Sequence, residues 1–256
     1  MTEPTCEFCG LVDKHRCRDA ETADECPHAP AEGKVPVVRS GPLAGLVRRK
    51  YGAIYADPPW TFTTRSDKGK GRSPEQHYDC MTLDEIKAMP VEEIAAEDCV
   101  LFLWVIDTHL QMALDVIREW GFTYKTRAFE WVKLQKQIAD WPMDRRDPLD
   151  GNPFFMGGGF WTRANPESCL LATKGSPKRL DAGVRRLIAS PLREHSRKPD
   201  ETYDRIETLV AGPYCELFSR STRPDWDQMG NEKGKFDNRQ LDLEDAIFDK
   251  EVEDLV

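Results

Sequence analysis

The sequence lacks long hydrophobic runs. No apolar stretch approaches the roughly 20 residues that a helix needs to cross a bilayer. No signal peptide opens the chain either, so the cytoplasm is the expected location. Apolar residues make up 39% of the 256 positions and charged residues 32%, which is typical of a soluble globular protein rather than a disordered one. This length suits one well-buried domain plus a small appendage.

Positive charge is also in short supply. The 45 acidic residues outnumber the 36 lysines and arginines, and the net charge is −9. The protein therefore has no global attraction to nucleic acid, and any such contact needs a local basic patch. Internal repeats, the Gly-x-Gly-x-x-Gly signature and the P-loop are all missing. Because these motifs are missing, the sequence gives no support for an enzyme that uses a nicotinamide cofactor or a nucleoside triphosphate.

What the chain does have is the tetrapeptide Asp57-Pro58-Pro59-Trp60. It follows residues 51–56, a short apolar run that predicts a buried strand. The prolines end the strand because they have no N–H to donate, and Asp57 before them is held extended. We therefore expect a carboxylate, two stiff carbonyls and an indole at the carboxyl end of a strand, where open α/β sheets bind ligands.

The tetrapeptide has two interpretations. In the first, a carboxylate and a carbonyl accept both hydrogens of an aromatic amine, which favours a pyramidal nitrogen whose lone pair can attack a methyl group. The prolines hold these acceptors in place, and Trp60 offers a face for stacking a base, worth about 1–3 kcal/mol. The proton leaves after attack, so no strong base is required. In the second interpretation the motif is a strand-ending turn with a buried tryptophan.

Eight cysteines fall into two groups. One group is dispersed and fits ordinary core or edge positions: Cys80, Cys99, Cys169 and Cys215. The other group crowds a polar segment at the start of the chain: Cys6, Cys9, Cys17 and Cys26. Four thiolates can close a tetrahedral zinc site and supply the folding energy that so small a module lacks.

This zinc site has alternatives. His15 or His28 can replace Cys17 or Cys26 as a ligand. The segment can instead be a disordered tail with free thiols, or it can carry two disulfides in an oxidising compartment. A second polar stretch, residues 61–80, carries four basic side chains and is either a mobile loop that closes on substrate phosphates or a solvated surface loop.

Strand and helix patterns alternate along the rest of the chain. Buried strands are predicted at 51–56, 99–105, 167–173 and 214–219, and one or two more within 122–133. Helices are predicted after a Thr82–Glu85 capping box, from Asp107 or Thr108 to Trp120, and from Pro199 to about Val210. This alternation predicts an α/β fold with a doubly wound, mainly parallel sheet.

A series of short signatures occurs in order between residues 57 and 231. They are Asp57-Pro-Pro-Trp60, Tyr78, Leu101 to Trp104, Trp131 to Lys133, Glu167 with Leu170, Lys174-Gly175, Ser196 to Glu201, Glu216 to Phe218, Arg220, and Trp226 with Gly230-Asn231. This series resembles the adenine-N6 methyltransferases of the MT-A70 type, a group with eukaryotic, bacterial and phage members. The resemblance covers about residues 50–232. It implies a Rossmann-like fold, S-adenosylmethionine as methyl donor, and a permuted order with the catalytic motif first.

The resemblance also assigns roles at the substrate end of the site. Asp57 and Pro58 would accept the hydrogens of the adenine amine, with Pro59 completing the rigid catalytic motif. Trp60 and Tyr78 would line the adenine pocket.

At the cofactor end, the resemblance places Lys198 on the carboxylate of S-adenosylmethionine, and it places Asp57 close to the same cofactor. Arg220, Asn231 and Glu232 would contact the ribose and the adenosine. The chain departs from the messenger-RNA enzyme at two points: Glu232 replaces a glutamine, and Thr222 falls near the place of a histidine. An aspartate-isoleucine segment that the family carries before the catalytic strand is not recognisable.

We therefore expect four regions: a cysteine-rich module at 1–28, a linker at 29–46, a methyltransferase domain at 47–232 and an acidic tail at 233–256. The expected activity is methyl transfer to N6 of a flipped-out adenine in DNA. The same reaction on RNA is the first alternative, and a non-catalytic nucleic-acid-binding partner is another. No membrane partner is expected, and the sequence leaves the oligomeric state and a partner subunit open.

Overall fold

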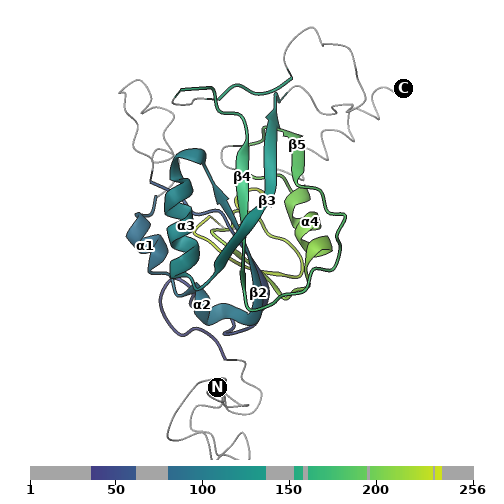
Figure 1. Cartoon of the computed structure of the whole chain (residues 1–256). Helices are drawn as coiled ribbons and strands as arrows, with labels where there is room; N and C mark the ends of the chain where they lie inside the picture. The colour runs from purple at the N-terminus through teal and green to yellow at the C-terminus, as the bar shows by residue number, and fades with distance from the viewer. Residues whose placement is uncertain are drawn as a thin grey trace, which may run out of the picture.

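The computed structural model describes residues 36–61, 80–136, 153–157, 161–194, 197–232 and 234–237. These residues form one seven-stranded sheet with helices on both of its faces (Figure 1). The strands are β1 (Tyr51–Ala56), β2 (Ala95–Val105), β3 (Thr123–Leu134), β4 (Glu167–Lys174), β5 (Leu187–Pro191), β6 (Tyr214–Leu217) and β7 (Trp226–Met229). The helices are α1 (Leu83–Lys87), α2 (Val91–Ile94), the 3₁₀ helix η4 (Asp107–His109), α3 (Leu110–Glu119) and α4 (Glu201–Leu209).

The sheet order is β5-β3-β4-β2-β1-β6-β7. Four neighbouring pairs are parallel, but β4 runs antiparallel to both β2 and β3. The sheet is therefore mixed, and the predicted α/β class is correct. The direction of β4 was not visible in the sequence, because burial on both faces gives a strand the same apolar composition in either direction.

Two edge strands, β5 and β7, were missed. Only Ile188 of β5 and Trp226 of β7 are buried, β5 has an apolar run of only three residues, and two of the four residues of β7 are polar. The weak pattern at 122–133 proves to be the single strand β3. A short polar edge strand is defined by the neighbour it pairs with, and its own sequence carries little signal.

The predicted capping box is present at α1. The Thr82 hydroxyl accepts from the backbone N–H of Glu85, and the Glu85 carboxylate accepts from the backbone N–H of Thr82. The other two helix starts differ from prediction. Residues 107–109 form η4, and α3 begins at Leu110 without a side-chain cap. Pro199 is not the first residue of α4, which begins at Glu201 after Asp200.

Successive residues of β1 point to opposite faces of the sheet and enter two separate cores. Ile54 and Ala56 face the core beneath α1 and α3, whereas Ala53 and Tyr55 face the core beneath α4. Figure 1 shows α1 and α3 on one side of the sheet and α4 on the other. No helix within the described ranges is long and apolar enough to cross a bilayer.

The carboxyl ends of three adjacent parallel strands meet at one edge of the sheet. Ala56 of β1 pairs with Leu217 of β6, and Leu217 pairs with Met229 of β7. The chain that follows each strand therefore emerges at the same place. These three segments bring Asp57, residues 218–222 and residues 230–232 together.

Candidate active site

Asp57 is held in place by a lysine from a distant segment. Nζ of Lys198 lies 2.6 Å from Oδ2 of Asp57 and 3.4 Å from Oε2 of Glu167, the first residue of β4. Lys133 of β3 forms a further ion pair with Glu167. Negative and positive groups thus alternate in the order Asp57, Lys198, Glu167, Lys133, which fixes the orientation of the Asp57 carboxylate.

Two lysines determine the charge of Glu167. Burial opposes ionisation of this carboxyl, but the ammonium groups of Lys198 and Lys133 outweigh burial and lower its pKa to about 2. Glu167 is therefore a carboxylate at any physiological pH. Its carboxylate forms an ion pair with Lys198, which also pairs with Asp57.

The rest of the tetrapeptide is fixed by hydrogen bonds. The carbonyl of Pro58 accepts from the Trp60 backbone N–H at 2.8 Å, and that of Pro59 accepts from the Met81 N–H at 3.0 Å. Each carbonyl keeps a second lone pair. The Trp60 indole N–H donates to the Trp104 carbonyl at 3.3 Å, and the ring is only 8% exposed, within the core beneath α1 and α3. In this arrangement the Trp60 ring has little free surface for stacking.

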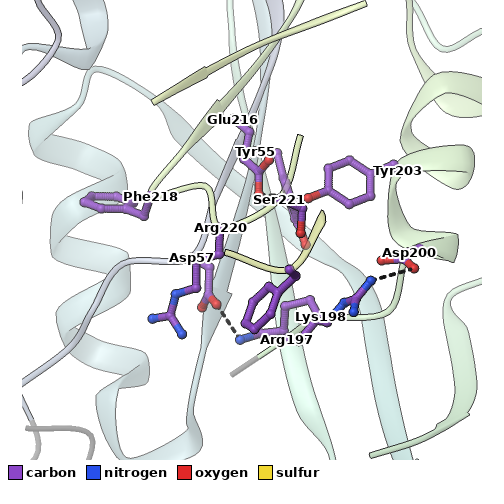
Figure 2. Close-up of a pocket in the computed structure, with 11 residues that line it drawn as sticks. Tyr55, Asp57, Arg197, Lys198, Asp200, Tyr203, Glu216, Phe218, Arg220 and Ser221 are labelled. Atoms are coloured by element: carbon purple, nitrogen blue, oxygen red, sulfur yellow. Dashed lines mark hydrogen bonds and ion pairs between the residues drawn. The ribbon is translucent and has the colours of Figure 1, made fainter. Parts of the chain in front are cut away.

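A pocket opens beside Asp57, with an empty volume of about 380 Å³ that is partly open solvent. Its lining is strongly polar and combines both signs of charge with aromatic rings. Figure 2 shows the Asp57 carboxylate directed at Lys198 in this pocket. The lining residues are Tyr55, Asp57, Arg197, Lys198, Asp200, Tyr203, Glu216, Phe218, Arg220, Ser221 and Phe236.

Glu216 of β6 is a buried acid in the wall of this pocket. Its carboxylate accepts from the Tyr203 hydroxyl at 2.9 Å and from the Gln228 amide at 2.6 Å. Burial raises the pKa of Glu216 to about 6, although the hydrogen bonds that it accepts partly oppose this shift. No role was assigned to Glu216 from the sequence, although it is the one acid in the strand Tyr214–Leu217 and could have been noticed for that reason.

Arg220, which lines the pocket, pairs with Glu232, which is not a lining residue. Nε of Arg220 lies 3.3 Å from Oε2 of Glu232, yet this buried oxygen accepts no hydrogen bond within the described part of the chain. Gly230 lets the segment after β7 approach the segment after β6, because a Cβ at residue 230 would lie 2.2 Å from the Ser219 carbonyl oxygen. Asn231 is exposed and is not among the lining residues.

The chemistry of this pocket suits S-adenosylmethionine. An ammonium at Lys198 is a partner for a carboxylate, and the unsatisfied acceptor at Glu232 is a partner for a ribose hydroxyl. A model of a protein family, described as MT-A70, matches residues 51–232, well over half of the chain.

The chain belongs to the MT-A70 family.

Methyltransferases of the MT-A70 family use S-adenosylmethionine. The chain is similar to a Mycoplasma protein, the type II methyltransferase M.MunI, at 29% identity over 205 residues, which cover 73% of this chain and 79% of the relative. It is also similar to a Drosophila melanogaster N(6)-adenosine-methyltransferase MT-A70-like protein, at 30% identity over 72% of this chain and 27% of the relative. The human N(6)-adenosine-methyltransferase catalytic subunit METTL3 is 28% identical, over 72% of this chain and 28% of the relative.

The chain thus spans most of the Mycoplasma relative but less than a third of the two eukaryotic MT-A70 relatives. The predicted site residues Asp57, Lys198 and Arg220 line one pocket, and Glu232 forms an ion pair with Arg220. Tyr78, the basic residues of 62–79 and the four cysteines predicted to bind zinc lie outside the described residues. Their roles stay predictions.

Several residues in or beside the pocket were assigned no role from the MT-A70 signatures. Glu167 and Lys133 belong to those signatures, but their pairing depends on β3 and β4 being neighbours. Tyr203 and Arg197 lie near the start of α4, where a helical pattern alone does not show which side chains face a ligand. Phe236 lies in the segment assigned to the acidic tail, and no sequence signal marked it.

Proposed function

We propose that this chain transfers a methyl group from S-adenosylmethionine to the exocyclic N6 amine of adenine in DNA. The observation that carries the proposal is the Asp57 carboxylate, oriented by Lys198 at 2.6 Å at the edge of the pocket. It is part of an intact Asp-Pro-Pro-Trp tetrapeptide whose carbonyls are pinned by backbone hydrogen bonds. Membership of the MT-A70 family and the names of its relatives support the same reaction.

Asp57 and Pro58 accept the two hydrogens of the adenine amine in this proposal. Both acceptors are already in place before the substrate arrives, so they need little reorganisation during the reaction. Withdrawing the hydrogens favours a pyramidal nitrogen, and its lone pair points away from the two acceptors. The Asp57 carboxylate also stabilises the positive charge that develops on the nitrogen. Breaking the methyl–sulfur bond would leave S-adenosylhomocysteine, and the nitrogen would then give its proton to water.

The cofactor is held by the opposite side of the pocket. S-adenosylmethionine supplies an electrophilic methyl group when it is bound. Lys198 binds its carboxylate, while Arg220, Asn231 and Glu232 take the ribose and adenosine end. The buried Glu232 Oε2, which has no hydrogen bond in the described residues, is the acceptor that a ribose hydroxyl would satisfy.

Two observations bear on the choice of nucleic acid. The alignment with a bacterial type II methyltransferase covers most of both chains, and this favours DNA because the catalytic domain resembles the compact bacterial and phage members. The alignments with proteins named N(6)-adenosine-methyltransferases favour RNA as the second candidate, at nearly the same identity. A non-catalytic nucleic-acid-binding partner fits less well, because the whole tetrapeptide and its lysine partner are intact.

The test supplies labelled S-adenosylmethionine to the full chain with unmethylated duplex DNA and, in parallel, with structured RNA. The product nucleosides are identified by mass. We expect N6-methyladenine in the DNA, lost in Asp57→Ala and retained in Asp84→Ala, a matched change at an exposed aspartate of α1.

The remaining outcomes separate the alternatives. Methylation of RNA alone would overturn the DNA assignment and keep the reaction. Binding of S-adenosylmethionine without transfer to either nucleic acid would indicate a missing partner subunit or a non-catalytic role. Equal transfer by Asp57→Ala would refute the proposed role of Asp57.

A further inference from the structure

Residues 234–237, which we call the strap, return to the pocket after β7. They lie beyond residue 232, the last that the family model matches, and within the part of the chain expected to be an acidic tail. Phe236 is nevertheless only 3% exposed and is one of the residues that line the pocket beside Asp57 and Lys198. The wall of the pocket thus includes a side chain that the family signatures do not contain.

The strap is fastened to the segment that follows β6. The Phe236 backbone N–H donates to the Arg220 carbonyl at 3.2 Å. Asp237, the residue after Phe236, accepts two hydrogen bonds from Thr222. The backbone N–H of Thr222 lies 2.8 Å from Oδ1 of Asp237, and its hydroxyl lies 2.7 Å from Oδ2. Gly234, at φ +80°, turns the chain back towards this anchor.

A buried arginine orients the Phe236 ring. The Arg197 guanidinium lies over the ring, 5.3 Å from its centroid, and Arg197 is only 5% exposed. This distance is within the range of a cation–π contact. One face of the ring is therefore occupied, and the rest of the ring contributes apolar surface to a pocket that is otherwise rich in charge.

We propose that Phe236 is a cofactor-binding residue, whose ring packs against the adenosine moiety of S-adenosylmethionine. This inference rests on the proposed function, which supplies the ligand. We place the Phe236 ring at the adenosine end of the ligand because the Phe236 backbone N–H donates a hydrogen bond to the Arg220 carbonyl. Arg220 in turn pairs with Glu232, and the proposed function assigns both residues to the adenosine end. A nucleobase gains from an apolar or aromatic surface, whereas the methionine carboxylate has its partner in Lys198.

Thr222 and Asp237 are positioning residues in this scheme. Thr222 stands near the place where the messenger-RNA enzyme carries a histidine, and both of its donors are committed to Asp237. Thr222 therefore acts on the cofactor only through the strap. Its two hydrogen bonds to Asp237 fix the position of Phe236.

The experiment measures the Kd of the full chain by calorimetry with two probes. S-adenosylmethionine carries both ends of the ligand, and 5′-methylthioadenosine carries the adenosine without the carboxylate. We expect Phe236→Ala to raise the Kd of both probes about tenfold, equivalent to about 1.4 kcal/mol. Lys198→Met should weaken S-adenosylmethionine far more than methylthioadenosine.

Matched variants separate binding from folding. Phe154→Ala makes the same change at a partly exposed phenylalanine outside the pocket and should leave both Kd values unchanged. Asp237→Ala should weaken both probes severalfold without removing a group that touches them. Phe236→Leu keeps most of the apolar volume but removes the aromatic ring. If thermal melting shows that Phe236→Ala is unfolded, the Kd of Phe236→Leu shows whether the ring contributes to binding.

The outcomes distinguish this inference from the function on which it rests. If the wild type does not bind S-adenosylmethionine, the proposed function fails and this inference fails with it. If the wild type binds and Phe236→Ala has an equal Kd, only the role of Phe236 is refuted. Tighter binding by Phe236→Ala would overturn it as well, because the ring would then obstruct the pocket. A loss confined to S-adenosylmethionine would place the ring at the wrong end of the ligand.

Discussion

The ammonium of Lys198 lies 2.6 Å from the carboxylate of Asp57, although 141 positions separate the two residues. Both side chains are mostly buried, with exposed fractions of 11% and 23%. Glu167 pairs with the same ammonium, at 3.4 Å. Lys198 is therefore shared between two acids, and only one of them, Asp57, borders the pocket.

Replacing Asp57 with asparagine keeps the shape of the side chain and removes its charge. We expect the rate of methyl transfer in single turnovers to fall by about 10²–10³, the loss typical of removing one preorganised electrostatic contact. Lys198 retains Glu167, so the chain should stay folded, which a thermal melt checks. A single-turnover rate within about threefold of the wild type would contradict an electrostatic role for this carboxylate.

Glu167 should make the protein sensitive to acid. Its pKa falls from an ordinary value of 4.5 to about 2 on folding, despite burial, because Lys198 and Lys133 stabilise the carboxylate. The stabilisation is fully present above about pH 4.5 and is lost as the pH falls towards 2, on the order of 3 kcal/mol. Urea unfolding from pH 3 to 7 should show a shallower pH dependence in Glu167→Gln. Identical slopes in both proteins would refute this assignment.

Glu216 should change the stability of the protein with pH in the direction opposite to Glu167. Burial raises its pKa to about 6, against hydrogen bonds from Tyr203, Gln228 and Ser219 and with a small contribution from the charge of Asp57. The folded state therefore favours the protonated carboxyl, and this contribution is present below about pH 4.5 and lost as the pH rises through 6. Carbon-13 NMR of the side-chain carboxyl should show a titration midpoint near 6. A midpoint near 4.5 would mean that the carboxyl is solvated in solution.

The capping box at α1 gives a prediction about stability alone. Thr82→Ala should lower the free energy of unfolding by about 1 kcal/mol, because a backbone N–H of the first turn loses its acceptor. Glu85→Ala and the double variant should lower it by similar amounts, since the two side chains cap each other. Urea denaturation measures all three variants, and methyl transfer should be unchanged. Additive losses would show that the two contacts are independent.

The cysteine-rich segment predicts a metal. We expect one zinc ion per chain, bound by Cys6, Cys9, Cys17 and Cys26, with no open coordination position. Metal analysis of the purified protein should find it, and Cys9→Ser should reduce the content. Free-thiol titration of a metal-free sample distinguishes the alternatives, because two disulfides would leave these four thiols unreactive.

The sequence predicted correctly those features that depend on a few adjacent residues. The apolar run of β1, the prolines after Asp57 and the Thr82 cap each depend on a few adjacent residues. The direction of β4, the edge strands β5 and β7, and the placement of Phe236 depend on neighbours far along the chain. The pairing of Lys198 with Asp57 belongs to the second kind. The resemblance to a family gave each residue a role at the cofactor, but it did not predict that the two side chains pair.

The sheet order has a consequence for how the protein is made. The strand before Asp57 pairs with β6, and the strap, which supplies Phe236 to the pocket, is made about 180 residues after Asp57. A nascent chain still attached to the ribosome thus displays its catalytic motif long before it has a place for the methyl donor. On the proposed function, we expect a product that stops before β7 to carry the Asp-Pro-Pro-Trp motif without methyl transfer activity, because it lacks the strap.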